Sequence, residues 1–309
     1  LSFGRTEDSA VRIGSFRLQS SPAENKPGTV AIETPDEALD HMFNTFLPAQ
    51  ILGSRFYGRT GFYQCGGAWG FRDQLQDASA LVLTHPNLVR AHIMRCAAVQ
   101  FEQGDVLHWW HRLPKAAGGL RGVRTRYSDD LLWLPLITAE YVRKTGDTEF
   151  LKIRAPYITG EELREDEHER YFYPGRSAVR TSIYEHCVRA VERASRFGEN
   201  GLPLIGGGDW NDGFNLVGIR GRGESVWLAQ FLAMVLEEMA PLCGLMDEAW
   251  RAADYRELAE RLKTAVEEKA WAGDRYLRAF YDDGSAMGCA GSQECEIDSL
   301  PQSFAVLSG

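Results

Sequence analysis

The chain has 309 residues, of which 44% are hydrophobic and 25% are charged, close to the average for a soluble globular protein. This composition excludes global disorder, and the net charge of −9 argues against nucleic acid as the main partner. We find no apolar run approaching the roughly 20 residues needed to span a bilayer, so no membrane segment is expected.

Six cysteines are spread along the chain, and none forms a C-x-x-C pair. This spacing is typical of reduced thiols and predicts a cytoplasmic protein rather than a disulfide framework. The N-terminus has neither a signal-peptide pattern nor an initiator methionine, so we expect a processed chain or a piece of a longer one.

Segment 1–33 alternates like extended chain, and helical periodicity begins at Thr34, a predicted helix cap. The spacing of apolar residues then predicts further helices over 87–103 (capped by Asn87), 129–144, 178–197, 224–242 and 247–271. Long stretches rich in Gly, Trp, Arg and Asp separate the helices, at 58–77, 104–128 and 200–223. This alternation predicts an α/α toroid with a cleft at one end of the helices.

The stretch IGGGDWNDG at 205–213 is the first candidate site. Its glycines permit unusual backbone angles and the close approach of a ligand. A polar turn would explain its asparagine and acids, but not Trp210 between Asp209 and Asp212. An aromatic ring beside a carboxylate is typical of a sugar site, where the ring covers the sugar and the acid protonates a glycosidic oxygen.

The stretch GGAWGFRDQLQD at 66–77 is the second candidate. Arg72 and Asp73 together offer donors and acceptors to neighbouring sugar hydroxyls, or alternatively brace the start of a helix. The glycines lack the G-K-[ST] and G-x-G-x-x-G patterns, so a nucleotide-binding loop is not predicted.

His108 and His111 lie three residues apart, and Asp105 lies three residues before the first of them. This is only a loose metal-binding spacing, and without a nearby cysteine we predict no metal site. The acids of segment 128–130 are predicted to cap the following helix.

The segments 66–77, 108–111, 124–135, 207–213 and 301–309 occur in this order and resemble the inverting glycoside phosphorylase family. That family includes cellobiose and chitobiose phosphorylases and the phosphorylase domain of cyclic β-1,2-glucan synthases. The form of segment 66–77 is most similar to the β-1,2-glucan branch.

The resemblance implies a mainly α fold, an (α/α)6 barrel or six-hairpin toroid, over residues 34–309. Residues 1–33 would then be the tail of a preceding β-sandwich and its linker. The barrel would be incomplete, because the family's later motifs, including a phosphate loop, lie beyond Gly309. Relatives often dimerise, so a homodimer is one expected assembly.

The resemblance also assigns roles to residues. Asp212 would be the general acid, although by chemistry alone Asp209 is its rival. The sugar-contacting residues that it implies are Arg72, Asp73, Gln74, Asp129, Asp209 and Trp210. Inorganic phosphate would attack the sugar as co-substrate without any cofactor, converting a β-glucoside, expected to be a β-1,2-glucooligosaccharide, to α-glucose 1-phosphate.

One departure from the family concerns phosphate. Similar proteins often have a basic residue shortly after the motif that contains Asp212, where this chain has Leu216. Arg220 and Arg222 are the possible substitutes.

Two alternatives stay open. An inverting hydrolase on the same scaffold would need a second carboxylate roughly 6.5–9.5 Å from Asp212, for which Glu296 and Asp298 are candidates. The third possibility is a carbohydrate-binding fragment without activity. For these 309 residues by themselves we expect no turnover, and for the parent protein an enzyme.

Overall fold

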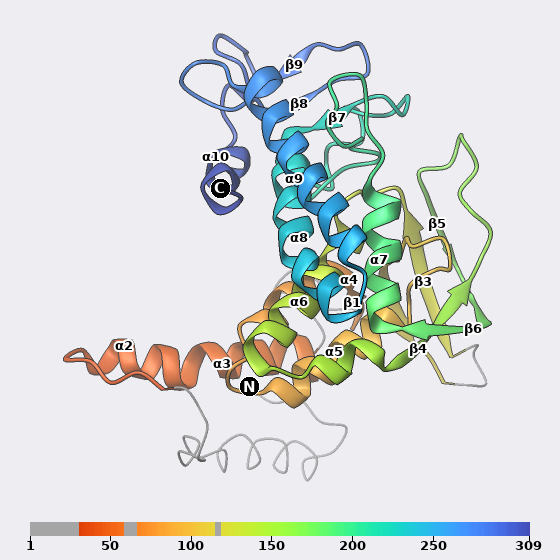
Figure 1. Ribbon diagram of the computed structural model, residues 1–309, viewed down its shortest axis with the longest axis vertical. Helices are drawn as coiled ribbons and strands as arrows, with labels where there is room; N and C mark the ends of the chain where they lie inside the picture. The colour runs from red at the N-terminus through yellow and green to blue at the C-terminus, as the bar shows by residue number, and fades with distance from the viewer. Residues whose placement is uncertain (1–30, 59–66, 115–118) are drawn as a thin grey trace, which may run out of the picture.

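The computed structural model describes residues 31–58, 67–114 and 119–309. The predicted extended segment 1–33 lies almost wholly outside the described residues, so its assignment to a β-sandwich stays a prediction. The described part is mainly α-helical and contains three small antiparallel sheets (Figure 1).

The helices are α2 (Glu37–His41), α3 (Leu47–Ile51), α4 (Phe71–Ser79), α5 (Pro86–Ala97), α6 (Trp133–Thr145), α7 (Ile183–Ala194), α8 (Val226–Leu245), α9 (Ala249–Ala270) and α10 (Ser299–Leu307). Two further segments, η1 (Met42–Phe46) and η2 (Leu52–Gly58), are π-helical, and η4 (Asp130–Leu132) and η5 (Thr148–Lys152) are 3-10 helices.

The first sheet has the order β1-β2-β3-β5, the second pairs β4 with β6, and the third has the order β7-β8-β9. The strands are β1 (Trp69–Gly70), β2 (Leu107–Arg112), β3 (Leu120–Thr125), β4 (Arg154–Thr159), β5 (Glu169–Phe172), β6 (Gly175–Ser182), β7 (Glu224–Ser225), β8 (Ala279–Phe280) and β9 (Ala286–Met287).

Three predicted helices are confirmed with shifted ends. α6 ends before Gly146, whose positive φ of 72° gives the left-handed C-cap that glycine favours. α8 begins at Val226 because the Ser225 hydroxyl accepts a backbone hydrogen bond from Leu228. α9 lies where the apolar spacing predicts it.

Three predicted helix starts are wrong. Asp36 rather than Thr34 caps α2, because its carboxylate accepts the first free N–H groups. α5 begins at Pro86 and does not use Asn87 as its cap. The helix predicted from Ala178 begins only after β6, because pairing with β4 draws those residues into a sheet.

The stretches 58–77 and 104–128, predicted as loops, contain α4 and the hairpin β2–β3. Within the hairpin His111 lies opposite Arg121, and β5 joins β3 from a later part of the chain. Strand pairing with a distant segment leaves little trace in local sequence, which is why the prediction missed this sheet.

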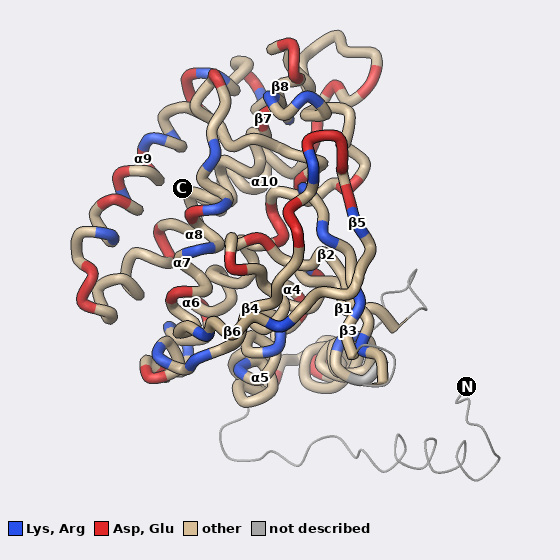
Figure 2. The backbone as a smooth tube through the Cα atoms, turned by 90° about the vertical axis from the view of Figure 1, so that its right-hand side faces the viewer, with Lys and Arg blue, Asp and Glu red and all other residues tan. Residues whose placement is uncertain are grey.

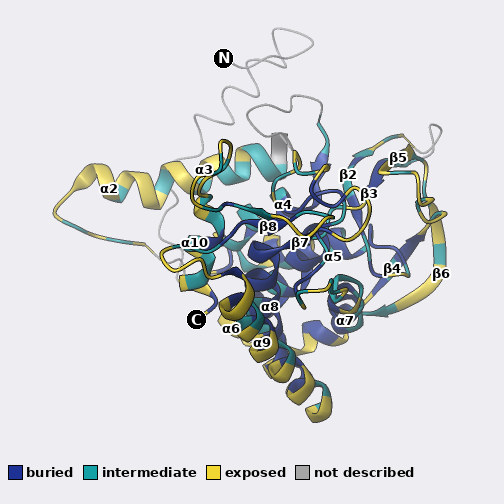
Figure 3. Ribbon diagram, turned by 90° about the horizontal axis from the view of Figure 1, so that it is seen from above, coloured by how far each residue is buried: buried dark blue, intermediate teal, exposed yellow. Residues whose placement is uncertain are grey.

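The buried helix α8 forms the core and packs beside α9 (Figure 1). The ring of Phe231 lies 4.6 Å from Trp133 and 5.2 Å from Trp227, measured between centroids. α8 is long and apolar enough to cross a membrane, which corrects the expectation of no such run, yet 67% of its apolar window is buried inside the protein. That burial is typical of a core helix (Figure 3).

Charged residues of both signs follow the neighbouring helix α9 (Figure 2). Its small buried side, which includes Tyr255 and Leu262, faces the core. A helix with this distribution screens the apolar core from water.

Residues 37–58 form a helical arm that extends from the body (Figures 1 and 3). Its exposed large apolar side chains are Leu39, Met42, Phe43, Phe46 and Leu47. The mainly α prediction is confirmed, whereas the incomplete (α/α)6 barrel and the domain boundary at 33/34 stay predictions.

We expect Phe231→Ala to lower the free energy of unfolding by about 3–5 kcal/mol, because the substitution leaves a cavity between Trp133 and Trp227. Equilibrium urea unfolding measures this loss. Val306→Ala, at an exposed position, serves as the control and should change stability by no more than about 0.5 kcal/mol. Equal effects of the two substitutions would contradict the account.

Candidate active site

The loop 206–213 carries both predicted acids and starts against the end of β3. The N–H of Gly207 donates to the carbonyl of Arg126 at 3.0 Å. Gly206 has a positive φ of 63°, and a Cβ there would lie 2.2 Å from that same carbonyl oxygen. The absence of a side chain at Gly206 therefore allows the close approach of the Arg126 backbone, whereas we expected the approach of a ligand.

Arg72, in the first turn of α4, connects this loop to the rest of the site. Its Nη1 lies 3.0 Å from both carboxylate oxygens of Asp129 and donates to the carbonyl of Asp209 at 2.9 Å. Its Nη2 donates to Oδ1 of Asp212, and its Nε lies 3.9 Å from Asp130. One guanidinium therefore joins three segments that are far apart in sequence.

The acids of segment 128–130 do not cap a helix as predicted. The side chain of Asp129 makes no capping bond and instead binds Arg72 and the indole N–H of Trp133. Asp130 lies with Oδ2 2.8 Å from Nδ1 of His108. Both carboxylates are buried, so they act inside the site rather than at its surface.

The cluster places one fixed cation among three carboxylates. Burial lowers the pKa of Arg72, but the attraction of Asp129, Asp130 and Asp212 raises it by more. The net pKa of Arg72 therefore lies well above its ordinary range. Burial raises the pKa of Asp129 to about 7 against the attraction of Arg72. One guanidinium therefore faces three carboxylates, at distances of up to 3.9 Å.

A second, fully buried ion pair lies behind the loop. Arg278 donates to both oxygens of Asp209 at 2.6 Å and to Asp298 at 2.9 Å. The Ser225 hydroxyl also donates to Asp209, at 2.6 Å. Asp209 and Arg278 are both buried, and their ion pair anchors the loop from behind.

The opposite end of the loop faces outward. The side chain of Asp212 is 48% exposed and Trp210 is 45% exposed. The hydroxyl of Tyr127 donates to the backbone carbonyl of Asp212 at 3.4 Å. The loop is therefore anchored by a buried ion pair at one end and exposes an acid and an aromatic ring to solvent at the other.

The other predicted sugar contacts lie at different depths. The side chain of Asp73 is 41% exposed, lies 4.0 Å from Arg55, and folds against Gly70, where a Cβ would clash with it. Gln74 is fully buried, and its amide has no hydrogen-bond partner among the described residues. The roles of Gln74, Asp129 and Asp209 as direct sugar contacts stay predictions; as described, all three lie behind the exposed surface.

The three residues with a loose metal-binding spacing each contact a different partner. His111 lies 3.3 Å from the hydroxyl of Tyr171, and Asp105 binds Arg124 at 2.6 Å, while His108 faces Asp130. The described residues hold no group of three or more side chains suited to a metal ion.

Sequence reasoning missed His108, Asp130 and Arg278 as parts of the site. His108 lies at an irregularity in β2 between Leu107 and Trp109, so the period-2 spacing of a regular strand gives no signal for its direction. Nothing near Arg278 in the sequence indicates its partner, which lies 69 residues earlier.

The two arginines proposed to bind phosphate, Arg220 and Arg222, lie beside open cavities. The carboxylate of Asp282 accepts the backbone N–H groups of Arg220 and Arg222, at 2.7 and 2.8 Å. Cavities of about 590 and 310 Å³ adjoin these residues, and Leu216 lines the smaller one. A phosphate-binding role for either arginine stays a prediction.

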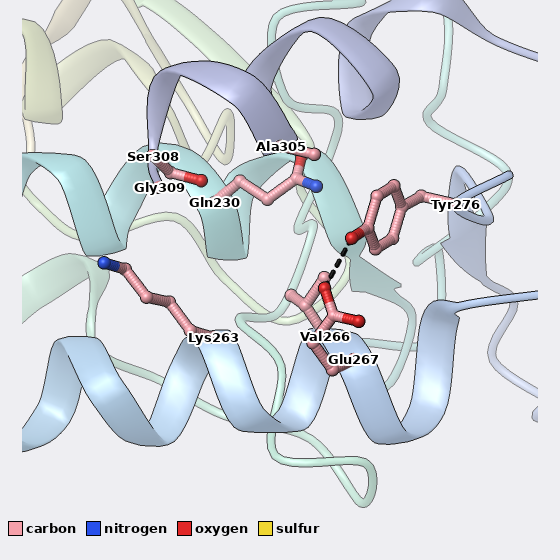
Figure 4. Close-up of a pocket in the computed structure, with 8 residues that line it drawn as sticks. All are labelled: Gln230, Lys263, Val266, Glu267, Tyr276, Ala305, Ser308 and Gly309. Carbon is pink, nitrogen blue, oxygen red and sulfur yellow. Dashed lines mark hydrogen bonds between the residues drawn. The ribbon is translucent and has the colours of Figure 1, made fainter.

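A third cavity, of about 40 Å³, lies between α8, α9 and α10 (Figure 4). Gln230, Lys263 and Glu267 line it, and the hydroxyl of Tyr276 donates to Glu267 across its edge. A space of this size holds a water molecule or two but no sugar ring.

The buried pair behind the loop predicts that Arg278→Met destabilises the fold by about 3–5 kcal/mol, because the substitution leaves Asp209 charged and unpaired in the interior. Chemical unfolding measures the loss, with the exposed Arg256→Met as control. Adding Asp209→Asn to Arg278→Met should recover part of the stability. Fully additive losses in the double variant would contradict the account.

Comparison with known proteins agrees with the motifs. Residues 24–309 match the glycosyl hydrolase 94 superfamily, catalytic domain. The chain is 48% identical to the cyclic beta-(1,2)-glucan synthase NdvB of Rhizobium meliloti (strain 1021), over 91% of this chain and 10% of that protein. It is 33% identical to the solabiose phosphorylase of Paenibacillus borealis, over 99% of this chain and 35% of that protein.

The chain thus spans between a tenth and about a third of the length of these relatives. Among solved structures, a rhamnosidase from Klebsiella oxytoca with rhamnose bound has a TM-score of 0.57 at 15% identity, over 91% of this chain and 46% of that one, a likeness of fold alone. Because the family model covers nearly all of its residues, this chain belongs to the catalytic domain family of the glycosyl hydrolase 94 superfamily.

Proposed function

We propose that this domain catalyses the inverting phosphorolysis of β-glucosides to α-glucose 1-phosphate. The observation that carries the proposal is the exposed Asp212, bonded to the buried Arg72 and two residues after the exposed Trp210. An exposed acid and an exposed aromatic ring on one short loop suit protonation of a glycosidic oxygen while the ring covers the sugar. The phosphorylases among the relatives support the choice of phosphate as nucleophile.

In the proposed reaction, Asp212 donates its proton to the oxygen that leaves the anomeric carbon. An oxygen of inorganic phosphate attacks that carbon from the opposite face, so the C–O bond to the leaving sugar breaks with inversion. Arg72 then stabilises the Asp212 carboxylate by charge and hydrogen bonding. No second carboxylate is needed, because phosphate takes the place of activated water.

The alternative of a hydrolase requires a free carboxylate to activate water. Both candidates have other partners: Asp298 binds Arg278 and caps α10, and Glu296 accepts the backbone N–H of Gly291 at 3.1 Å. These contacts favour the phosphorylase proposal.

We propose β-1,2-linked glucooligosaccharides as the substrate class. The similarity to NdvB, a cyclic beta-(1,2)-glucan synthase, supports this choice, as does the form of segment 66–77. The (α/α)6 barrel is proposed as the scaffold, supported by the paired helices α8 and α9.

The function is tested in the full-length protein with β-1,2-glucooligosaccharides and inorganic phosphate, by measuring glucose 1-phosphate and free glucose. Asp212→Asn should lower kcat by about 10²- to 10⁴-fold, the usual contribution of a general acid. Glu296→Gln serves as the matched control and should keep wild-type activity.

Two outcomes would overturn the proposal. Equal release of free glucose with and without phosphate, lost in Glu296→Gln, would instead support the hydrolase. Full activity in Asp212→Asn would remove the assigned acid.

A further inference from the structure

One group beside Asp212 has no role in the reaction as proposed so far. The side chain of His108, on β2, is only 15% exposed, and its Nε2 lies 3.7 Å from Oδ2 of Asp212. Its other ring nitrogen, Nδ1, lies 2.8 Å from Oδ2 of Asp130. A histidine held between two carboxylates can exchange a proton with the carboxylate that loses its proton in the reaction, here Asp212.

The pairing with Arg72 creates the need for such a group. Arg72 donates a hydrogen bond to Asp212, whereas a general acid has to carry a proton at the start of each turnover. Each turnover removes the proton from Asp212, and the ion pair then holds the resulting carboxylate. A proton has to return to that carboxylate before the next turnover.

We propose that His108 is the residue that returns it. The imidazolium transfers the proton on Nε2 to Oδ2 of Asp212, while Nδ1–H stays bonded to Asp130. The neutral ring then takes a proton from solvent, into which the phosphate group of the product releases one. Over the cycle, one proton passes from hydrogen phosphate to the leaving hydroxyl, so the count balances. The inference rests on the proposed function.

The groups that face His108 come from four parts of the chain: Arg72 from α4, Asp130 from η4, Asp212 from the loop, and Tyr127, whose ring packs edge-on at 4.7 Å. Burial lowers the pKa of His108, Asp130 and Asp212 raise it, Arg72 lowers it, and the net direction is upward. His108 therefore keeps its proton at pH values where a free histidine has lost it. That reserve disappears as the pH rises through the raised pKa.

The test compares His108→Gln with His111→Gln, a control on the same strand whose partner is Tyr171. In phosphorolysis of a β-1,2-glucooligosaccharide by the full-length protein, His108→Gln should lower kcat by about 10- to 100-fold with KM little changed. The basic limb of its pH profile should move to lower pH. Asp130→Asn should move that limb in the same direction, and His111→Gln should leave it in place.

A second substrate separates proton delivery from a structural role. Dinitrophenyl β-glucoside has a leaving group that needs no proton, so His108→Gln should keep close to wild-type kcat on it. An equal loss on both substrates, or an unchanged pH profile with the oligosaccharide, would overturn the proposal.

A third measurement does not depend on turnover. If the wild-type protein forms no glucose 1-phosphate, the proposed function fails, and ¹⁵N NMR of the His108 ring still tests the inference. The ring should titrate above the ordinary histidine range, and Asp130→Asn should lower its titration midpoint. A ring that is neutral throughout the range where free histidine titrates would overturn the proposal.

Discussion

The contact on which the site depends is the buried Arg72 guanidinium. It draws together Asp129, 57 residues later, and Asp212, 140 residues later, and it also holds the carbonyl of Asp209. A planar fork with several donors can satisfy such partners together, whereas a single ammonium cannot. Removing this side chain would leave buried carboxylates without their cation, so the fold around it and the chemistry in front of it depend on the same contact.

The loop with the acid is held from two sides. Arg72 binds the backbone of Asp209, and Arg278 binds its carboxylate from the core. The exposed end of the loop, which follows Asp209, carries Trp210 and Asp212. In the proposed reaction, an acid on a loop held this way needs little reorganisation when charge develops, which is the physical advantage of anchoring the loop with buried ion pairs.

The sequence predicted well those parts that local pattern determines. The glycine after α6 and the apolar spacing of α8 and α9 led to confirmed helices, and the family motifs indicated Arg72 and Asp212. It failed where distant contacts decide. Strands β1 and β5 join the first sheet across long separations, and Arg278 meets its partner only in the fold. Local capping rules predicted the wrong role for Asp129, because a buried arginine competes for its carboxylate.

The central claim is that the fork of Arg72, and not its charge alone, holds the acid in its working position. Measuring kcat and thermal unfolding for Arg72→Lys in the full-length protein tests this most directly, because lysine keeps the charge and loses the fork. The account predicts a loss of at least about 100-fold in phosphorolysis by a protein that still unfolds cooperatively. A folded Arg72→Lys variant with near wild-type kcat would contradict it.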